Sequence, residues 1–328
     1  MADRAYSVVS PRLAANEDPD AQAYQLVATM LSAQRELSYS GEQVTVIYND
    51  TGPINSSEQT VIHDGLRGSR IEYHSPARLA GESRGDNGKF LWHYIAQKRE
   101  VQQLPSALDR LRTEIRKAEV SLKRRAIACR FMGEETVAGR RAAVVQVSST
   151  APGSGVAPGT RRFWIDPVNG AQLRIMIFGP TGNPASDSYF TQITYNPVIA
   201  ADAFDPPAVG GRSQSTAEVP IKSLRHVPEG VIPVLGFDVL EPAYLPPGYR
   251  FENGQIFQYK GSQAFGMRYV NGITVMSLYQ VRAPNERKRD QFRINRPGML
   301  TGFRGGIQVV LLGNLDTVEL TRVFQSLR

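Results

Sequence analysis

Cysteine is nearly absent from this sequence, and long hydrophobic runs are absent altogether. The lone Cys129 excludes an internal disulfide and a metal site built from cysteines. No run of about eighteen apolar residues occurs, so no segment is predicted to span a membrane. Histidine is scarce too. The four histidines, His63, His74, His93 and His226, are isolated and lack metal-ligand spacing.

The motifs of common enzyme classes are missing as well. Gly153, Gly155 and Gly159 are close together, but no Gly-Lys-Ser/Thr follows them, so a flexible loop is a better interpretation than a phosphate cradle. Ser154 does not complete a G-x-S-x-G elbow, because Pro152 occupies its first position. We therefore expect a protein that is not an enzyme, with no catalytic residues, no metal and no cofactor.

The charge balance is mildly basic. There are 38 Lys and Arg against 31 Asp and Glu, a net charge of +7. This excess favours anionic partners such as acidic peptides or lipid head groups, and it falls short of a nucleic-acid signature. With 328 residues and 41% hydrophobic content, the chain is large enough for two domains, each with its own core.

The first part of the chain is dominated by a period of two. After a polar lead-in over 1–20, a helix is predicted over 21–37, with an apolar stripe at helical spacing. A second, amphipathic helix is predicted over 106–125. Alternating segments surround it and predict strands near 39–48, 58–64, 69–76, 89–96, 101–104, 126–132, 140–148 and 189–195, with a turn at 84–88. This order predicts an α+β fold, in which a large curved antiparallel sheet carries helices on one face.

One hairpin, Arg161–Phe178, has an excess of apolar residues on both faces. Pro167 and Gly170 favour a short turn between its strands. Such a surplus fits either an ordinary core or a cavity large enough for an acyl chain. We take Arg162 and Arg174 to mark the outer face, which places Trp164 and Met176 outside. The candidate cavity residues are then Val44, Val46, Tyr48, Phe90, Trp92, Tyr94, Phe163, Ile165, Leu173, Ile175 and Ile177.

A domain boundary is predicted after Phe204-Asp-Pro-Pro207. The sequence divides into the lead-in 1–20, a first domain 21–207, a Gly, Ser and Thr-rich linker 208–220 and a second domain 221–328. Strands are predicted in the second domain near 250–259, 264–270, 273–282 and 307–312. A terminal helix follows, with Asp316 and Glu319 resembling a capping box.

Two basic segments are candidates for partner contact. The 106–125 helix carries Arg112, Arg116, Lys117, Lys123 and Arg124 on one face, which is typical of a solvated surface or of one that docks an acidic partner. The 282–296 run lies in a loop or at a sheet edge. Its candidate partner-binding residues are Arg287, Lys288, Arg289 and Arg293, because clustered cations steer encounter with acidic surfaces.

Several stretches of the first domain together resemble the lipoprotein-carrier superfamily with the LolA/LolB-like fold. They are Arg35-Glu-Leu-Ser-Tyr-Ser-Gly41, Asp86-Asn-Gly-Lys-Phe-Leu-Trp-His-Tyr94, Val137-Ala-Gly-Arg140, Tyr195-Asn-Pro197 and Phe204-Asp-Pro-Pro207. The second domain narrows the match. Leu245-Pro-Pro-Gly-Tyr249, Met267–Tyr279 and Ile307–Gly313 with a terminal helix resemble the C-terminal domain of the RseB/MucB family.

The resemblance implies a fold and a function. The first domain would be a half-open antiparallel barrel with helices lidding a hydrophobic cavity, and the second a smaller α+β domain. The protein would be a periplasmic regulator of sigma-E envelope-stress signalling, with its signal peptide removed. It would bind the extracytoplasmic part of an anti-sigma factor, and a lipid or lipoprotein acyl chain in the cavity would release that partner. It would be peripheral to the membrane at most, with no nucleic-acid partner. The alternative is a periplasmic carrier of lipids or outer-membrane lipoproteins.

Overall fold

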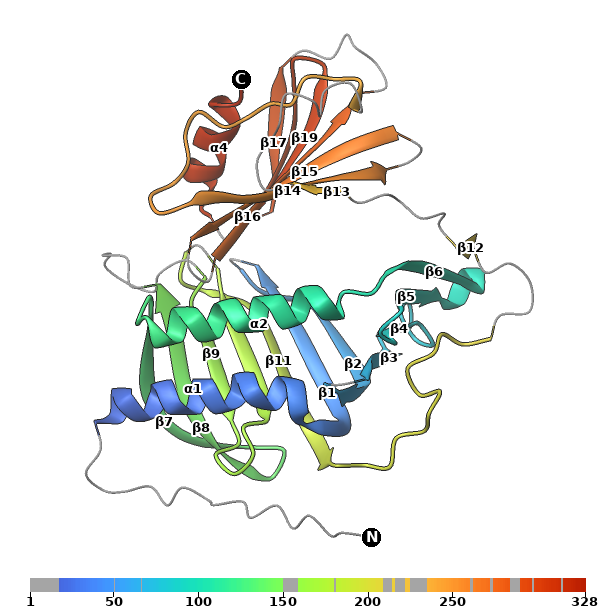
Figure 1. Ribbon diagram of the computed structural model, residues 1–328, viewed down its shortest axis with the longest axis vertical. Helices are drawn as coiled ribbons and strands as arrows, with labels where there is room; N and C mark the ends of the chain where they lie inside the picture. The colour runs from blue at the N-terminus through green and yellow to red at the C-terminus, as the bar shows by residue number, and fades with distance from the viewer. Residues whose placement is uncertain are drawn as a thin grey trace.

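The computed structural model shows two sheets, one built from the N-terminal part of the chain and one from the C-terminal part (Figure 1). It describes residues 18–49, 51–65, 67–149, 159–179, 181–208, 214–215, 222–224, 235–259, 262–271, 274–283, 290–296, 298–313 and 315–328. None of the helices in these ranges is long and apolar enough to cross a membrane.

The larger sheet has twelve strands. They are β1 (Ser38–Asn49), β2 (Gly52–Asp64), β3 (Gly68–Ser75), β4 (Ser83–Asp86), β5 (Phe90–Ile95), β6 (Glu100–Pro105), β7 (Ile127–Val137), β8 (Arg140–Ser149), β9 (Arg161–Ile165), β10 (Gln172–Phe178), β11 (Pro184–Tyr195) and β12 (Gln214–Ser215). Their order is β12-β6-β5-β4-β3-β2-β1-β11-β10-β9-β8-β7, and every neighbouring pair is antiparallel except β12 with β6. Since β12 and β7 end this order without pairing, the described sheet is open.

Two helices lie across one face of this sheet (Figure 1). Helix α1 (Pro19–Glu36) starts where Asp18 accepts a hydrogen bond from the Asp20 amide (3.1 Å) and Pro19 fixes the first turn. Helix α2 (Leu108–Lys123) follows β6. Both contribute to what we call the helix-side cluster, a core that joins the helices to β7, β8 and β9: Ala23, Val27, Met30, Leu31, Ile115, Leu122, Ile127, Cys129, Val145, Val147, Phe163 and Ile165.

The β9–β10 hairpin forms as its sequence predicts. Gly170 adopts a positive φ of 77°, and the Val168 amide donates to the Asp166 carboxylate (2.9 Å). A Cβ atom at Gly170 would lie only 2.8 Å from the Thr29 carbonyl oxygen of α1. Glycine is therefore required here both for the turn and for the close approach of the helix.

Trp164 corrects our expectation about the outer face of this hairpin. It lies beside Arg174, as the alternation predicts, but only 2% of it is exposed. Its indole N–H donates to a Glu135 carboxylate oxygen (2.7 Å), and the Arg174 guanidinium lies 4.2 Å from the ring. Trp164 was predicted to lie on the outer face beside the arginines. It does lie beside Arg174, but it is buried, because a second hydrophobic cluster forms on this face. This second cluster contains no helix residue: Val61, Val137, Ala142, Val144, Trp164, Leu173, Phe190 and Ile193.

The smaller sheet has seven strands in the order β13-β14-β15-β16-β19-β18-β17. They are β13 (Lys222–Leu224), β14 (Arg250–Tyr259), β15 (Ser262–Asn271), β16 (Thr274–Arg282), β17 (Gln291–Arg296), β18 (Met299–Arg304) and β19 (Ile307–Gly313). Helix α4 (Thr317–Gln325) packs on one face through Leu320, Val323 and Phe324. Its start confirms the predicted cap, since the Glu319 amide donates to the Asp316 carboxylate (2.7 Å).

The α+β class, the open and almost wholly antiparallel sheet and the order of most elements are confirmed. Two local predictions were wrong. Part of the predicted turn at 84–88 is strand β4. Its Gly85 packs so closely against Trp92 that a Cβ atom there would lie 2.6 Å from the indole ring. Strands β17 and β18 were missed. The lead-in as far as residue 17, the loop 152–158 and most of the linker 208–220 lie outside the described residues. The division into domains stays a prediction.

Candidate functional site

The residues predicted to line one cavity are distributed over several environments. Phe163, Ile165 and Ile175 pack in or against the helix-side cluster. Leu173 belongs to the second cluster instead, because the pairing of β10 with β9 shifts between Gln172 and Arg174. A bulge of this kind reverses the faces of the residues on either side of it. Ile177 is half-buried.

The candidates on β1 lie elsewhere. Val44, Val46 and Tyr48 are half-buried, and Val46 and Tyr48 line an open groove of about 620 Å³. Arg174 and Asp187 also line this groove and form a two-point ion pair, with N–O distances of 2.9 and 2.8 Å. Its walls are therefore partly charged, unlike the apolar lining that was expected.

On β5, the aromatic candidates have different surroundings. Phe90 is 44% exposed, Tyr94 is half-buried, and Trp92 is buried with its indole N–H donating to the Phe204 carbonyl oxygen (2.8 Å). Trp92 thus fastens the segment after β11 to the sheet, which is a structural role. The described residues do not bring the candidates together on one surface, and an acyl cavity remains a prediction.

Only one residue of the predicted basic patch is described. Arg293 is exposed on the edge strand β17, and its Nε donates to the Thr301 hydroxyl at 3.4 Å. Arg287, Lys288 and Arg289 lie outside the described residues. Partner binding by this patch also remains a prediction.

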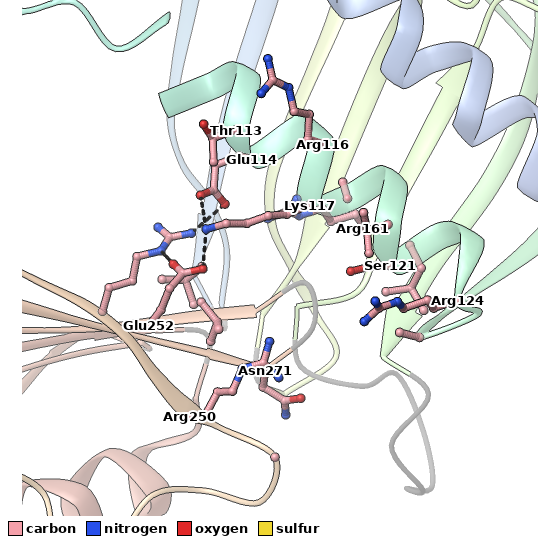
Figure 2. A pocket seen from close by; sticks show the side chains of 18 residues that line it. Thr113, Glu114, Arg116, Lys117, Ser121, Arg124, Arg161, Arg250, Glu252 and Asn271 are labelled. Carbon is pink, nitrogen blue, oxygen red and sulfur yellow. Dashed lines mark hydrogen bonds and ion pairs between the residues drawn. The ribbon is translucent and has the colours of Figure 1, made fainter. Parts of the chain in front are cut away.

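A more clearly formed site lies between α2 and the smaller sheet. We call it the basic cleft, a cavity of about 830 Å³ between side chains of α2 and β9 on one side and of β14, β15 and β16 on the other (Figure 2). The cations that line it are Arg116, Lys117, Arg124, Arg161, Arg250 and Arg268, while the carboxylates among its described lining residues are Glu114 and Glu252. The cleft is therefore strongly positive.

Four of these cations lack an acidic partner. Arg116, Arg124, Arg161 and Arg250 form no ion pair with any other residue in the described part of the chain. Arg161 is half-buried, and burial lowers the pKa of its guanidinium because the charged form loses hydration. Arg116, Arg124 and Arg250 are exposed, so Arg161 is the half-buried member of the group. A half-buried cation without a counter-ion favours the binding of an anionic group.

The other two cations belong to a charge quartet that joins α2 to the smaller sheet, Glu114, Lys117, Glu252 and Arg268. Figure 2 labels Glu114, Lys117 and Glu252 of this quartet. The contacts across the boundary are Lys117 to Glu252 (2.6 Å) and Arg268 to Glu114 (3.1 Å). Burial alone would raise the pKa of Glu252, but hydrogen bonds from Lys117 and Arg268 outweigh it and lower that pKa. The quartet holds one end of the cleft.

Sequence reasoning found half of this site. The basic face of α2 supplies Arg116, Lys117 and Arg124, as the docking alternative for that helix allowed. Arg161, Arg250 and Arg268 were not singled out, because each stands alone on a strand and far from the helix in sequence. No local signal could have found them.

No protein-family model matches the sequence, and no curated protein matches it either. Solved structures do match it. One in the complex of Pseudomonas aeruginosa MucA/MucB has a TM-score of 0.63 and 17% identity, covering 94% of this chain and 98% of that one. One of MucB in complex with MucA(peri) has a TM-score of 0.62 and 17% identity, covering 93% and 98%.

A structure of MucB alone gives a TM-score of 0.58 at 18% identity, covering 94% of this chain and 98% of that one. Because the similarity covers nearly the whole length of both chains, it includes both sheets of this protein. It is therefore more than the similarity of a single shared domain. The protein therefore has the two-sheet fold of MucB, which confirms at the level of the fold its resemblance to the RseB/MucB family.

Proposed function

We propose that this protein is a non-enzymatic, periplasmic regulator of envelope-stress signalling, and that it binds an acidic extracytoplasmic segment of an anti-sigma factor in the basic cleft. The observation that carries the proposal is a group of arginines without acidic partners among the described residues, Arg116, Arg124, Arg161 and Arg250. The MucB structures that include MucA or MucA(peri) support a partner of this class.

The chemistry of the cleft suits a carboxylate-rich peptide. Guanidinium groups bind carboxylates through paired hydrogen bonds, and they do so most strongly where the site is partly desolvated. Arg161 and Arg250 stand on opposite sides of the cleft, so a peptide between them would contact both sheets. Binding would then depend on the two sheets keeping their present arrangement.

The test uses the extracytoplasmic segment of a candidate anti-sigma factor from the same organism. We expect Arg161→Glu and Arg250→Glu each to weaken its binding about tenfold or more, roughly 1.4 kcal/mol, because each places a carboxylate where the partner needs a cation. Isothermal titration calorimetry at low and moderate salt measures this. Arg78→Glu, an exposed arginine after β3, is the matched control. Unchanged affinity in both cleft variants would refute the proposal.

The same titration discriminates between the two basic surfaces. Reversing the charges of Arg287, Lys288 and Arg289 together tests the patch that the sequence predicted. If the patch variant loses binding and the cleft variants do not, the partner binds at the 282–296 segment and the cleft has another role.

We further propose that a lipid or lipoprotein acyl chain reaches the apolar surface beneath α2 and releases the partner. The support is the weak anchoring of α2, which buries Ile115 and Leu122 but leaves Leu111 and Val120 45% and 46% exposed. Displacing this helix would uncover the helix-side cluster and move Arg116 and Lys117 at the same time. Native mass spectrometry with lipid extraction tests acyl-chain binding. Absence of any bound lipid, and no effect of added lipid on peptide affinity, would argue against this part.

A further inference from the structure

The face of the smaller sheet that turns away from α4 carries an uncovered aromatic site. We call it the aromatic pocket, a cavity of about 270 Å³ lined by Phe257, Tyr259, Ala264, Tyr279, Gln280, Val281, Gln308 and Val310. Tyr259 and Tyr279 are 47% and 37% exposed. The core of this sheet lies on its opposite face, which packs on α4.

The geometry of the pocket depends on one glycine. The rings of Phe257 and Tyr279 meet edge to face at 6.0 Å. A Cβ atom at Gly266 would lie 3.0 Å from the Tyr279 ring and 3.3 Å from the Phe257 ring. Glycine therefore lets both aromatic rings lie close over β15 and shape a recess between them.

The aromatic pocket and the basic cleft lie on the same face of β15 and β16. Gly266 pairs with Tyr279, Arg268 with Ser277, and Val270 with Val275, so these alternate residues point to one side of β15 and β16. Arg268, Val270 and Val275 line the cleft, while Ala264 and Tyr279 line the pocket. From Arg268 to Ala264 the strand advances by about 13 Å, at roughly 3.3 Å per residue.

We propose that the segment bound in the basic cleft continues along this face and inserts one large apolar side chain, such as Phe, Leu or Met, into the aromatic pocket. The inference rests on the proposed function. The arginines of the cleft would hold the acidic part of the segment and thereby fix its register. An extended chain of about four residues then spans the distance to the pocket.

The size of the pocket favours a side chain over other occupants. Pockets for whole small molecules begin near about 300 Å³, so this recess fits a single large side chain. A stable dimer needs about 800 Å² from each partner, far more than one recess provides. The neighbouring cations favour an acidic segment over a second copy of this basic chain.

The experiment uses the full chain and synthetic peptides with an all-glutamate head, a Gly-Ser spacer of about four residues and a terminal Phe or Ala, made in both orientations. Fluorescence anisotropy measures affinity. We expect Phe in place of Ala to increase affinity about tenfold in one orientation, because burying the ring removes apolar surface from water. Tyr279→Ala should abolish that gain and leave the affinity of the Ala peptide unchanged. Phe292→Ala, an aromatic on β17 that is 39% exposed, is the matched control and should keep the gain.

The outcomes separate this inference from the proposed function. If the head binds and Phe adds nothing in either orientation, or if its gain survives Tyr279→Ala, the aromatic pocket is not the site. If no peptide binds, and the anti-sigma segment binds the wild type and Arg161→Glu with equal affinity, the proposed function itself has failed. If wild-type protein dimerises in sedimentation and Tyr279→Ala does not, a second copy occupies the pocket and the inference is overturned.

Discussion

Each sheet has one face covered by helices: α1 and α2 on the larger sheet, and α4 on the smaller. The other faces of the two sheets differ in how far their aromatic side chains are buried. In the larger sheet that face buries Trp164 and Leu173 in the second cluster, where Arg174 lies over the indole ring and pairs with the buried Asp187. In the smaller sheet the corresponding face leaves Tyr259 and Tyr279 substantially exposed and places Arg268 beside the basic cleft.

The difference separates packing from binding. Aromatic rings that are buried and hydrogen-bonded within the sheet stabilise the fold, whereas exposed rings beside a basic cleft can contribute binding free energy to a partner. The comparison therefore predicts that substitutions on the second face of the larger sheet change stability, and that those on the second face of the smaller sheet change binding.

The largest expected effect distinguishes Trp164 from Tyr279. We expect Trp164→Ala to lower the free energy of unfolding by about 3–5 kcal/mol, because it leaves a cavity in the second cluster. Tyr279→Ala should lower it by less than about 1 kcal/mol, since much of the ring is already in water. Urea unfolding, with hydrogen exchange followed separately in β9 and β16, measures both. Similar losses for the two variants would remove the basis of the comparison.

A smaller effect is expected at Arg174. Arg174→Met keeps an apolar stem over Trp164 but leaves Asp187, which is only 4% exposed, without its cation. An unsatisfied buried polar group costs about 1–3 kcal/mol, and a charged one such as this carboxylate costs at least the upper part of that range. Arg141→Met, which breaks a mostly exposed pair with Glu134, is the control and should cost less than about 1 kcal/mol. Equal losses of stability in Arg174→Met and Arg141→Met would contradict the burial of the ion pair on the second face.

The charge quartet should contribute less to stability than to the arrangement of the sheets. Lys117→Met breaks the contact with Glu252 and should cost less than about 1 kcal/mol, because the pair is partly exposed. We expect increased freedom between the sheets, measured as a larger spread of distances between spin labels placed one on each sheet. Lys123→Met, an exposed lysine on the same helix, should leave the distances unchanged. An unaltered distribution in Lys117→Met would show that other contacts hold the sheets.

The smallest effect concerns acid pH. The pKa of Glu252 is lowered in the folded chain, so its contribution is present above its ordinary value of 4.5 and is lost as pH falls through the lowered pKa. The sheets should therefore separate slightly more below about pH 4, and small-angle scattering can follow this. In Glu252→Gln the acid-dependent part of the change should shrink, because that carboxylate no longer titrates.

Much of this protein was predictable where the signal is local. Alternation of apolar residues gave most strands, the Pro167 and Gly170 turn was correct, and Asp316 does cap α4. β17 was missed because a run dense in Arg and Asn obscures its alternation, and β18 was missed because one of its two buried positions, Gly302, has no side chain. The inward face of the β10 strand was misassigned at Leu173, because a bulge is a property of two paired strands and has no signature in either alone.

The sequence by itself determined the α+β class, the two sheets in their order and the basic face of α2, since each follows from periodicity or composition within a short segment. Only the tertiary structure decided where that basic face points. Arg161 from β9 lies beside it on one side of a cleft, Arg250 from β14 lies on the other side, and the aromatic pocket lies farther along β15 and β16. A site built from residues so distant in sequence exists only once the chain brings them together, because charge and shape act through space.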